Sequence, residues 1–116
     1  MNEPEWYSAK LRFAVMVEPD GADLLYDCVF LFKATDFDAA FERAISIGEA
    51  QQEEYRNGEG RRVIWKFSTV FSLDVIAAAD LDGAEICADP ISLAKEDKIP
   101  FATEFNPRLS KPTQTI

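Results

Sequence analysis

Two stretches of the chain alternate between apolar and polar side chains, which is the period of a β-strand with one buried face. In residues 6–18 one face carries Tyr7, Ala9, Leu11, Phe13, Val15 and Val17. In residues 61–76 the corresponding face carries Val63, Trp65, Phe67, Thr69, Phe71, Leu73 and Val75. Both stretches are predicted to be strands. Because the alternation in 61–76 never slips, we expect no bulge in its middle.

A third apolar run, residues 24–34, follows the first strand after a short segment, residues 19–23, that contains Pro and Gly. Proline fixes φ and glycine permits positive φ, so this segment is predicted to be a turn that joins two strands in a hairpin. The run is apolar on both faces, with Cys28, Phe30 and Phe32 on one and Val29 and Leu31 on the other. This pattern favours a central strand that is covered on both sides.

Apolar residues then recur at spacings of three and four, which predicts an amphipathic helix over residues 36–56. The stripe consists of Phe37, Ala40, Phe41, Ala44, Ile45 and Gly48. Thr35 or Asp36 can cap the helix N-terminus, and Asn57 with Gly58 can end the helix in the left-handed conformation. Glycine inside a helix costs about 1 kcal/mol relative to alanine. Its position on the stripe therefore predicts a close approach of helix and sheet.

Together these elements predict one α+β domain over residues 1–90. It is an antiparallel sheet of three to four strands, in the order β-β-α-β, with one amphipathic helix on one face. The fourth, short strand is expected at residues 84–88. Residues 91–116 show no sustained periodicity and are predicted to be an extended C-terminal arm, anchored by Phe101 and Phe105. If the strands before and after the helix are adjacent, the crossover makes them parallel.

The strand predicted over residues 61–76 is long for a domain of this size. Its sixteen residues would span about 53 Å if fully extended, whereas a compact chain of this length has a diameter of about 35 Å. The strand must coil strongly, break or extend into a second chain. Together with a second sheet face that is partly apolar, this mismatch indicates a homodimer.

Short motifs in the first three-quarters of the chain resemble a known family. They are Trp6-Tyr7-Ser8-Ala9-Lys10-Leu11, and Glu53-Glu54-Tyr55-Arg56-Asn57-Gly58-Glu59-Gly60 followed by Val63-Ile64-Trp65-Lys66-Phe67. With the order strand, strand, helix, strand, they resemble bacterial domain-of-unknown-function family 4288 over about residues 6–76. The resemblance implies a compact α+β domain and supplies no activity, ligand or catalytic residue. It leaves the C-terminal 40 residues outside the family.

The net charge of −9 repels nucleic-acid phosphates and favours basic partners. No apolar run approaches the roughly 20 residues of a membrane helix. The first residues show neither the basic nor the apolar segment of a signal peptide. Cys28 and Cys87 lack a CxxC spacing, which is typical of a protein in a reducing compartment. We therefore expect a cytoplasmic protein that binds neither nucleic acid nor a membrane.

Charge is distributed unevenly along the chain. Residues 36–56 carry six acidic and two basic side chains, whereas residues 61–76 carry three basic and one acidic. The alternation places several basic side chains on the sheet face opposite the main apolar row. On that face they lie beside the apolar side chains of Met16, Ile64 and Val70. This face is expected to bind an anion or an acidic chain, or to be covered by the arm or a second subunit. Its candidate binding residues are Trp6, Lys10, Arg12, Arg62 and Lys66.

The acidic face of the predicted helix supplies the other candidate binding residues, Glu42, Glu49 and Glu53. They are expected to form a docking surface for a basic protein, unless they are only a solvated helix face. Glu49 and Glu53 are four residues apart and would be neighbours on a helix. Together with Tyr55, such a carboxylate pair could instead serve acid–base chemistry.

Histidine is absent, which removes the usual general base and the commonest zinc ligand. The glycine-rich segment 57–60 follows a helix and lacks the Lys-Ser/Thr pair of a phosphate-binding loop, so it is expected to be a turn. We expect no catalytic residues, no cofactor and no metal. Three hypotheses for function remain. The first is a non-catalytic domain that binds a basic protein, as toxin-immunity proteins do; this is an analogy of size and charge. The second is a domain that binds a small ligand or an anion on the basic sheet face. The third is a small carboxylate-dependent enzyme.

Overall fold

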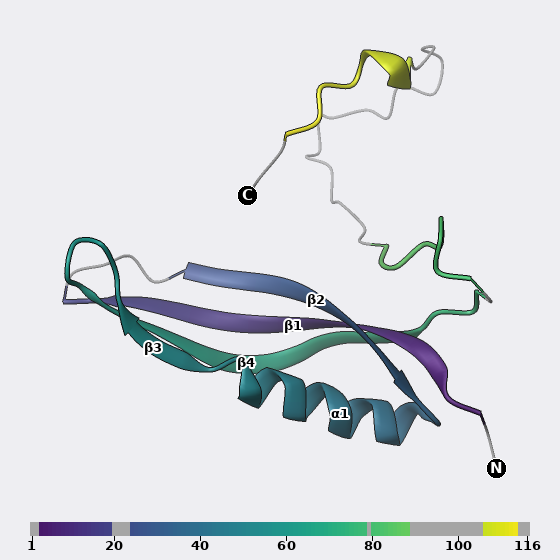
Figure 1. Cartoon of the computed structure of the whole chain (residues 1–116), viewed down its shortest axis with the longest axis horizontal. Coiled ribbons are helices and arrows are strands. Elements are labelled where there is room, and N and C mark those ends of the chain that lie inside the picture. The colour runs from purple at the N-terminus through teal and green to yellow at the C-terminus, as the bar shows by residue number, and fades with distance from the viewer. Residues whose placement is uncertain (1–2, 20–23, 79, 89–105, 114–116) are drawn as a thin grey trace, which may run out of the picture.

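The computed structural model describes residues 3–19, 24–78, 80–88 and 106–113. Within them the chain forms a four-stranded antiparallel sheet with one α-helix on one face (Figure 1), which confirms the predicted α+β fold. The elements in chain order are β1 (Glu5–Glu18), β2 (Leu24–Ala34), α1 (Phe37–Ala50), β3 (Glu53–Arg56), β4 (Arg62–Val75) and a 3₁₀ turn (Pro107–Leu109).

β1 is a central strand, because the strand order is β2-β1-β4-β3. Leu11 of β1 lies opposite Cys28 of β2 and Val70 of β4. β2 and β4 are therefore not adjacent, and the parallel pairing considered for them does not form. The prediction that residues 24–34 form a central strand is also wrong, since β2 lies at the edge and its Leu25 is 66% exposed. Hydrophobic side chains on both faces of a strand do not require a neighbouring strand on both edges.

β4 contains two irregularities that its sequence pattern conceals. Its register with β1 shifts between residues 10 and 11 of β1 and again between residues 12 and 13 of β1. These shifts leave Phe71 and Ser68 of β4 without an opposite residue in β1. Each extra residue moves the following side chains to the other face of the sheet, and two of them restore the original phase. The prediction of an unbulged strand is thus wrong, and Val70 packs against the core instead of the opposite face. The long strands also coil, as Figure 1 shows.

The core lies between the sheet and α1. Its buried members are Tyr7, Ala9, Leu11 and Phe13 of β1, Phe32 and Ala34 of β2, and Ala40 and Ala44 of α1. Ala40, Ala44 and Gly48 are spaced one turn apart, and their small size lets the helix lie close to the strands. A Cβ atom at Gly48 would lie 2.6 Å from ring atoms of Phe67. The predicted close approach at this glycine is confirmed.

α1 begins after Asp36, whose carboxylate accepts a hydrogen bond from the backbone nitrogen of Ala39 at 2.8 Å. It ends at Ala50 and not at residue 56 as predicted. The physical reason is that residues 53–56 pair with β4 as the short strand β3. Hydrogen bonds with the edge of β4 thus replace the helical turn that was predicted for these residues. The additional short strand of the sheet is therefore β3, which comes before β4 in the chain.

Residues 84–88, predicted to be the fourth strand, form no strand. They contact the sheet on the side that faces away from α1, where the carbonyl of Ile86 accepts a hydrogen bond from the hydroxyl of Ser8 at 2.7 Å. The predicted anchors of the arm, Phe101 and Phe105, lie outside the described residues.

Candidate functional site

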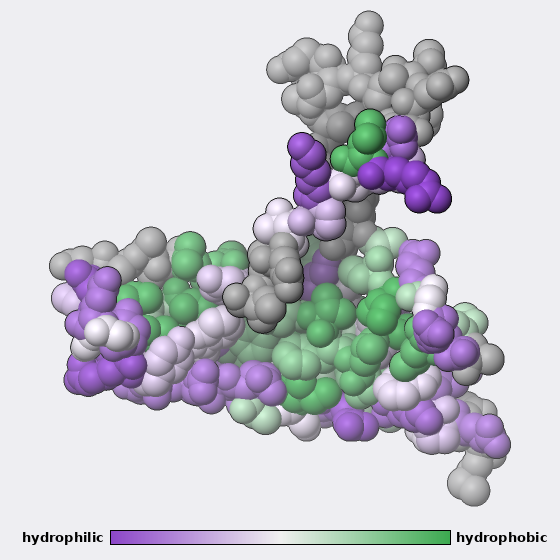
Figure 2. Space-filling model, turned by 45° about the horizontal axis from the view of Figure 1, so that its top comes forward, coloured by the Kyte–Doolittle hydropathy of each residue, from purple (hydrophilic) through white to green (hydrophobic). Residues whose placement is uncertain are grey.

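The sheet face that points away from α1, here called the open face, carries Trp6, Ser8, Lys10, Arg12, Ala14 and Met16 of β1. Figure 2 looks toward this side and shows apolar residues gathered over the strands, with hydrophilic residues along the rim. The neighbouring apolar side chains are between 40% and 66% exposed; they are Leu25, Val29 and Leu31 of β2 and Phe71 of β4. Exposed apolar area of this kind is typical of a contact surface.

Lys10 lies in the middle of the open face but is buried, with only 8% of its surface exposed. Its ammonium group is 5.8 Å from the centroid of the Phe71 ring. Ser8, which is 4% exposed, is held by its hydrogen bond to Ile86. The chain itself therefore covers this part of the open face, and Lys10, one of the candidate binding residues, is buried there.

Arg12 is engaged on two sides. Its Nε and Nη2 donate to the two carboxylate oxygens of Asp27 at 2.8 Å and 3.0 Å, across the β1–β2 pair. Its guanidinium also lies over the ring of Phe71, 4.2 Å from the centroid. The hydrogen bond lowers the pKa of Asp27 and raises the pKa of Arg12. Both interactions hold Arg12 within the protein and reduce its capacity to bind an external anion.

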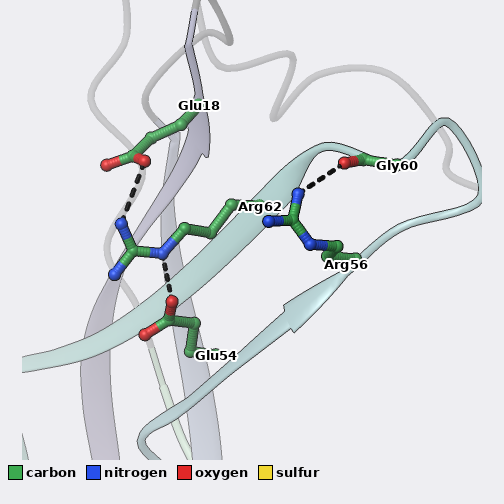
Figure 3. A network of polar contacts seen from close by, with 5 residues as sticks. All are labelled: Glu18, Glu54, Arg56, Gly60 and Arg62. Carbon is green, nitrogen blue, oxygen red and sulfur yellow. Dashed lines mark hydrogen bonds and ion pairs between the residues drawn. The ribbon is translucent and has the colours of Figure 1, made fainter.

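Arg62 lies at the far end of the sheet between two carboxylates (Figure 3). Its Nη1 donates to Glu18 of β1 at 3.1 Å, and its Nε donates to Glu54 of β3. Arg56 donates instead to the carbonyl of Gly60 at 2.9 Å. The hydrogen bond from Arg62 lowers the pKa of Glu54 and raises that of Arg62 itself. This network joins the ends of β1, β3 and β4.

The predicted basic residues therefore share a sheet face but do not converge on one anion site. Trp6 lies near the opposite end of β1, where the ammonium of Lys33 is 5.1 Å from its ring centroid. Lys66 is exposed on β4. Arg12 and Arg62 are each paired with carboxylates from other strands. The alternation of single strands could not reveal those partners, because they depend on strand order and register.

α1 presents to solvent an acidic ridge, defined as Asp38, Glu42 and Glu49. Their spacing places them on one side of the helix. All three are exposed, and none has an ion-pair partner among the described residues. Arg43, the one basic residue of α1, is directed to the sheet and donates to the carbonyl of Lys33 at 3.1 Å. Within the described part of the chain, the ridge is therefore a negative surface whose carboxylates are not neutralised by ion pairs.

Glu53 belongs to β3, where it lies opposite Trp65 of β4. The predicted helical pair of Glu49 and Glu53 is therefore not formed. The hydroxyl of Tyr55 accepts a hydrogen bond from the indole nitrogen of Trp65 at 3.4 Å. The acid–base hypothesis assumed that Glu49 and Glu53 are neighbours on one helix, and the structure does not contain that pair.

A pocket of about 190 Å³ lies where α1 ends above the sheet. It is lined by Phe13, Cys28, Phe30, Gln51, Glu53 and Trp65. The rings of Phe13 and Trp65 are tilted by 57° with centroids 6.1 Å apart. Burial raises the pKa of the Cys28 thiol, which keeps it neutral near pH 7. The alternation placed Phe13 and Trp65 on one face, but only the early end of the helix opens a pocket above them.

Asn57 organises the turn between β3 and β4. Its side-chain oxygen accepts hydrogen bonds from the backbone nitrogens of Glu59 and Arg61 at 2.9 Å and 3.0 Å. Gly60 adopts a φ of +77°, which favours glycine. Two backbone N–H groups that could have bound a phosphate thus donate their hydrogen bonds to Asn57 instead. The segment is a turn as predicted, although it joins two strands and does not end a helix.

Among the residues that the structure describes, no three His, Cys, Asp or Glu side chains gather closely enough to hold a metal ion. Within the same residues, no helix has both the length and the hydropathy that a membrane span requires.

The family model of a domain of unknown function, DUF4288, matches residues 6–88. This chain belongs to the DUF4288 family. The match extends past residue 76 and includes residues 84–88, which contact Ser8. The prediction that the last 40 residues lie wholly outside the family is therefore wrong. No curated protein and no solved structure matches the chain. The open face, the acidic ridge and the pocket all lie within the DUF4288 region.

Proposed function

We propose that this DUF4288 domain is a non-catalytic module that binds a basic protein through α1 and the adjoining end of β3. The observation that carries the proposal is the acidic ridge, whose three carboxylates form no ion pair with the residues that the structure describes. Phe37 and Phe41 on the same helix are 57% and 41% exposed. Exposed aromatic rings provide apolar contact area, and the carboxylates provide charge complementarity and orientation.

The anion-binding alternative on the open face has weaker support. Its two arginines, Arg12 and Arg62, are held by carboxylates of the protein, and Lys10 is buried. An anion would have to displace those carboxylates at a cost in stability. The acidic ridge requires no such displacement. Neutralisation of a basic toxin is one activity that a module of this kind would suit.

The test compares two variants with the same change in net charge. One neutralises the ridge with Asp38→Asn, Glu42→Gln and Glu49→Gln. The control neutralises three exposed acids elsewhere, Glu3→Gln, Glu59→Gln and Glu85→Gln. Immobilised wild-type protein and both variants are incubated with lysate of the source cells, and the retained proteins are quantified by mass spectrometry.

We expect a basic protein to be retained by the wild type and the control, and to be lost from the ridge variant. Salt at 1 M should release it, since the Debye length falls to about 3 Å. Equal retention by both variants, or retention that resists salt, would overturn the proposal.

We also propose that the domain forms a homodimer through β2. The outer edge of β2 pairs with no described strand, and its Leu24, Leu25, Tyr26, Val29 and Leu31 are exposed. Such an edge is a template for adding a strand. Antiparallel pairing with a second copy, centred on Phe30, would set Asp27 opposite Lys33 of the other copy and Val29 opposite Leu31.

Sedimentation equilibrium tests this dimer. The wild type should sediment as a dimer, and Val29→Lys should sediment as a monomer because it introduces like charges near the centre of the contact. Leu25→Lys, toward the end of the contact, should have a smaller effect. A wild type that remains monomeric at millimolar concentration, or a Val29→Lys variant that remains dimeric, would exclude the β2 interface.

A further inference from the structure

The pocket beside β3 has aromatic walls. Phe13, Phe30 and Trp65 line it, and of these Phe13 is only 1% exposed whereas Phe30 and Trp65 are partly exposed. Tyr26 stacks on Trp65 with a centroid separation of 5.2 Å, so it occupies one face of that ring and leaves the other for a ligand. The faces of aromatic rings carry negative electrostatic potential and attract cations, with tryptophan the strongest. The walls therefore favour a ligand that is both apolar in shape and positively charged.

The border of the pocket is negative as well. Glu53 contributes an exposed carboxylate, and Gln51 is the C-cap residue that follows the last residue of α1. The C-terminus of a helix carries partial negative charge, which lysine or arginine commonly offsets. The last turn of α1 contains no basic residue and does contain Glu49. Three independent features, the rings, the carboxylate and the helix end, thus attract positive charge to one place.

We propose that this pocket binds an organic cation, specifically the side chain of an arginine or lysine carried by a protein partner. This inference rests on the proposed function and names its contact point. A guanidinium or alkylammonium group matches the pocket because its carbon stem can lie against the rings while its N–H groups reach Glu53. An anion would meet Glu53 and the helix end, and the described residues provide no set of ligands for a metal ion.

Glu49, the last residue of the acidic ridge, lies in the final turn of α1, two residues before Gln51 of the pocket. A partner segment with further basic residues could place one side chain in the pocket and the others along the ridge. Linked contacts of this kind raise affinity well above that of one side chain alone. The pocket therefore fixes the position of the partner, and the ridge adds less specific attraction.

The experiment uses a Trp6→Phe protein, in which Trp65 is the remaining tryptophan. Its fluorescence is followed during titration with N-acetyl-arginine amide, with N-acetyl-lysine amide and with uncharged N-acetyl-glutamine amide. A peptide of alternating arginine and glycine is titrated in parallel. We expect saturable changes with the cations and the peptide, none with the glutamine compound, and at least tenfold tighter binding of the peptide.

Glu53→Gln and Glu85→Gln form the matched pair of variants, since each removes one exposed carboxylate and Glu85 lies outside both the pocket and the acidic ridge. Glu53→Gln should weaken binding of N-acetyl-arginine amide about tenfold, because it removes a charge-assisted hydrogen bond. Glu85→Gln, away from the pocket, should change it less than about twofold. Phe30→Leu should also weaken binding while circular dichroism shows an unchanged fold.

Each other outcome overturns a defined part of the inference. Equal effects of Glu53→Gln and Glu85→Gln would exclude the pocket as the binding site and leave the acidic surface of the proposed function intact. Binding of the free amide as tight as that of the peptide would identify a small-molecule site and exclude a side chain carried by a protein. A response to the glutamine compound would show that charge does not select the ligand.

Discussion

Two regions on the α1 side of the sheet are built from the same strands and differ in how closely the helix approaches. Over Phe67, Gly48 brings α1 so near that a Cβ atom would overlap the ring. Beyond Ala50 the helix has ended, and the neighbouring rings of Phe13 and Trp65 border a pocket. The first region, here called the closed region, is tightly packed, and in the second, the open region, the side chains of Phe30 and Trp65 stay partly exposed. The difference follows from where the helix ends.

The strongest test of the closed region is the removal of a large buried side chain. Leu11 is fully buried beneath α1, so Leu11→Ala should lower the free energy of unfolding by about 2–5 kcal/mol through lost contacts and a cavity. The matched Leu25→Ala, at a 66% exposed position of β2, should change it by less than about 0.5 kcal/mol. Urea titration measures both variants. Similar losses at the two sites would show that the core is not confined to the closed region.

The closed region is tested more sharply by adding a single methyl group. Gly48→Ala should destabilise the protein by about 1–3 kcal/mol, because the overlap with Phe67 outweighs the gain in helix propensity of about 1 kcal/mol. Gly58→Ala is the control and should be nearly neutral, since no atom lies within 4 Å of the place that its Cβ would occupy. A more stable Gly48→Ala variant would mean that α1 can move away from the sheet without cost.

The strands of this fold follow from local patterns, whereas the open region does not. Alternation identified β1 and β4, and the spacing of Ala40, Ala44 and Gly48 identified the packed side of α1. The end of α1 was missed because residues 53–56 fit a helical pattern equally well, and only their pairing with β4 makes them a strand. The bulges were missed because two one-residue shifts cancel in the sequence pattern.

The same limit applies to the candidate sites. The basic residues were placed on the correct face, but the carboxylates that pair with Arg12 and Arg62 lie on other strands. Of the acidic residues, Glu42 and Glu49 lie on the helix as expected, whereas Glu53 lies beside Trp65. Strand order and register, which the sequence pattern does not contain, decide both results.

The start of α1 offers a smaller test of what positions the helix. Asp36→Ala removes the carboxylate that accepts from the Ala39 N–H, and should lower the free energy of unfolding by about 1 kcal/mol. Thr35→Ala, the other residue that the sequence allowed as a cap, should have little effect. Thermal unfolding compares the two. A larger loss from Thr35→Ala would place the helix start one residue earlier.

The smallest expected effect is a pH dependence on the open face, away from both regions. The hydrogen bond from Arg12 lowers the pKa of Asp27 below its ordinary value of 3.8. The stabilising effect of this carboxylate is therefore present above that value, and is lost as the pH falls through the lower pKa of the folded state. Arg12→Gln removes the donor, so the stability difference between wild type and variant should shrink below about pH 4. Urea midpoints from pH 7 to pH 2 measure it, and a difference independent of pH would contradict the assigned cause.

The most direct measurement of the central claim uses the two tryptophans. Trp65 lines the pocket on the α1 side of the sheet, and Trp6 lies on the opposite, open face. In a ¹H–¹⁵N spectrum of the wild-type protein, their indole N–H groups give separate signals. Addition of N-acetyl-arginine amide should shift the signal of Trp65, with saturation, and leave that of Trp6 unchanged. A shift of Trp6 alone, equal shifts of both or no shift of either would contradict the assignment of the pocket as the cation site.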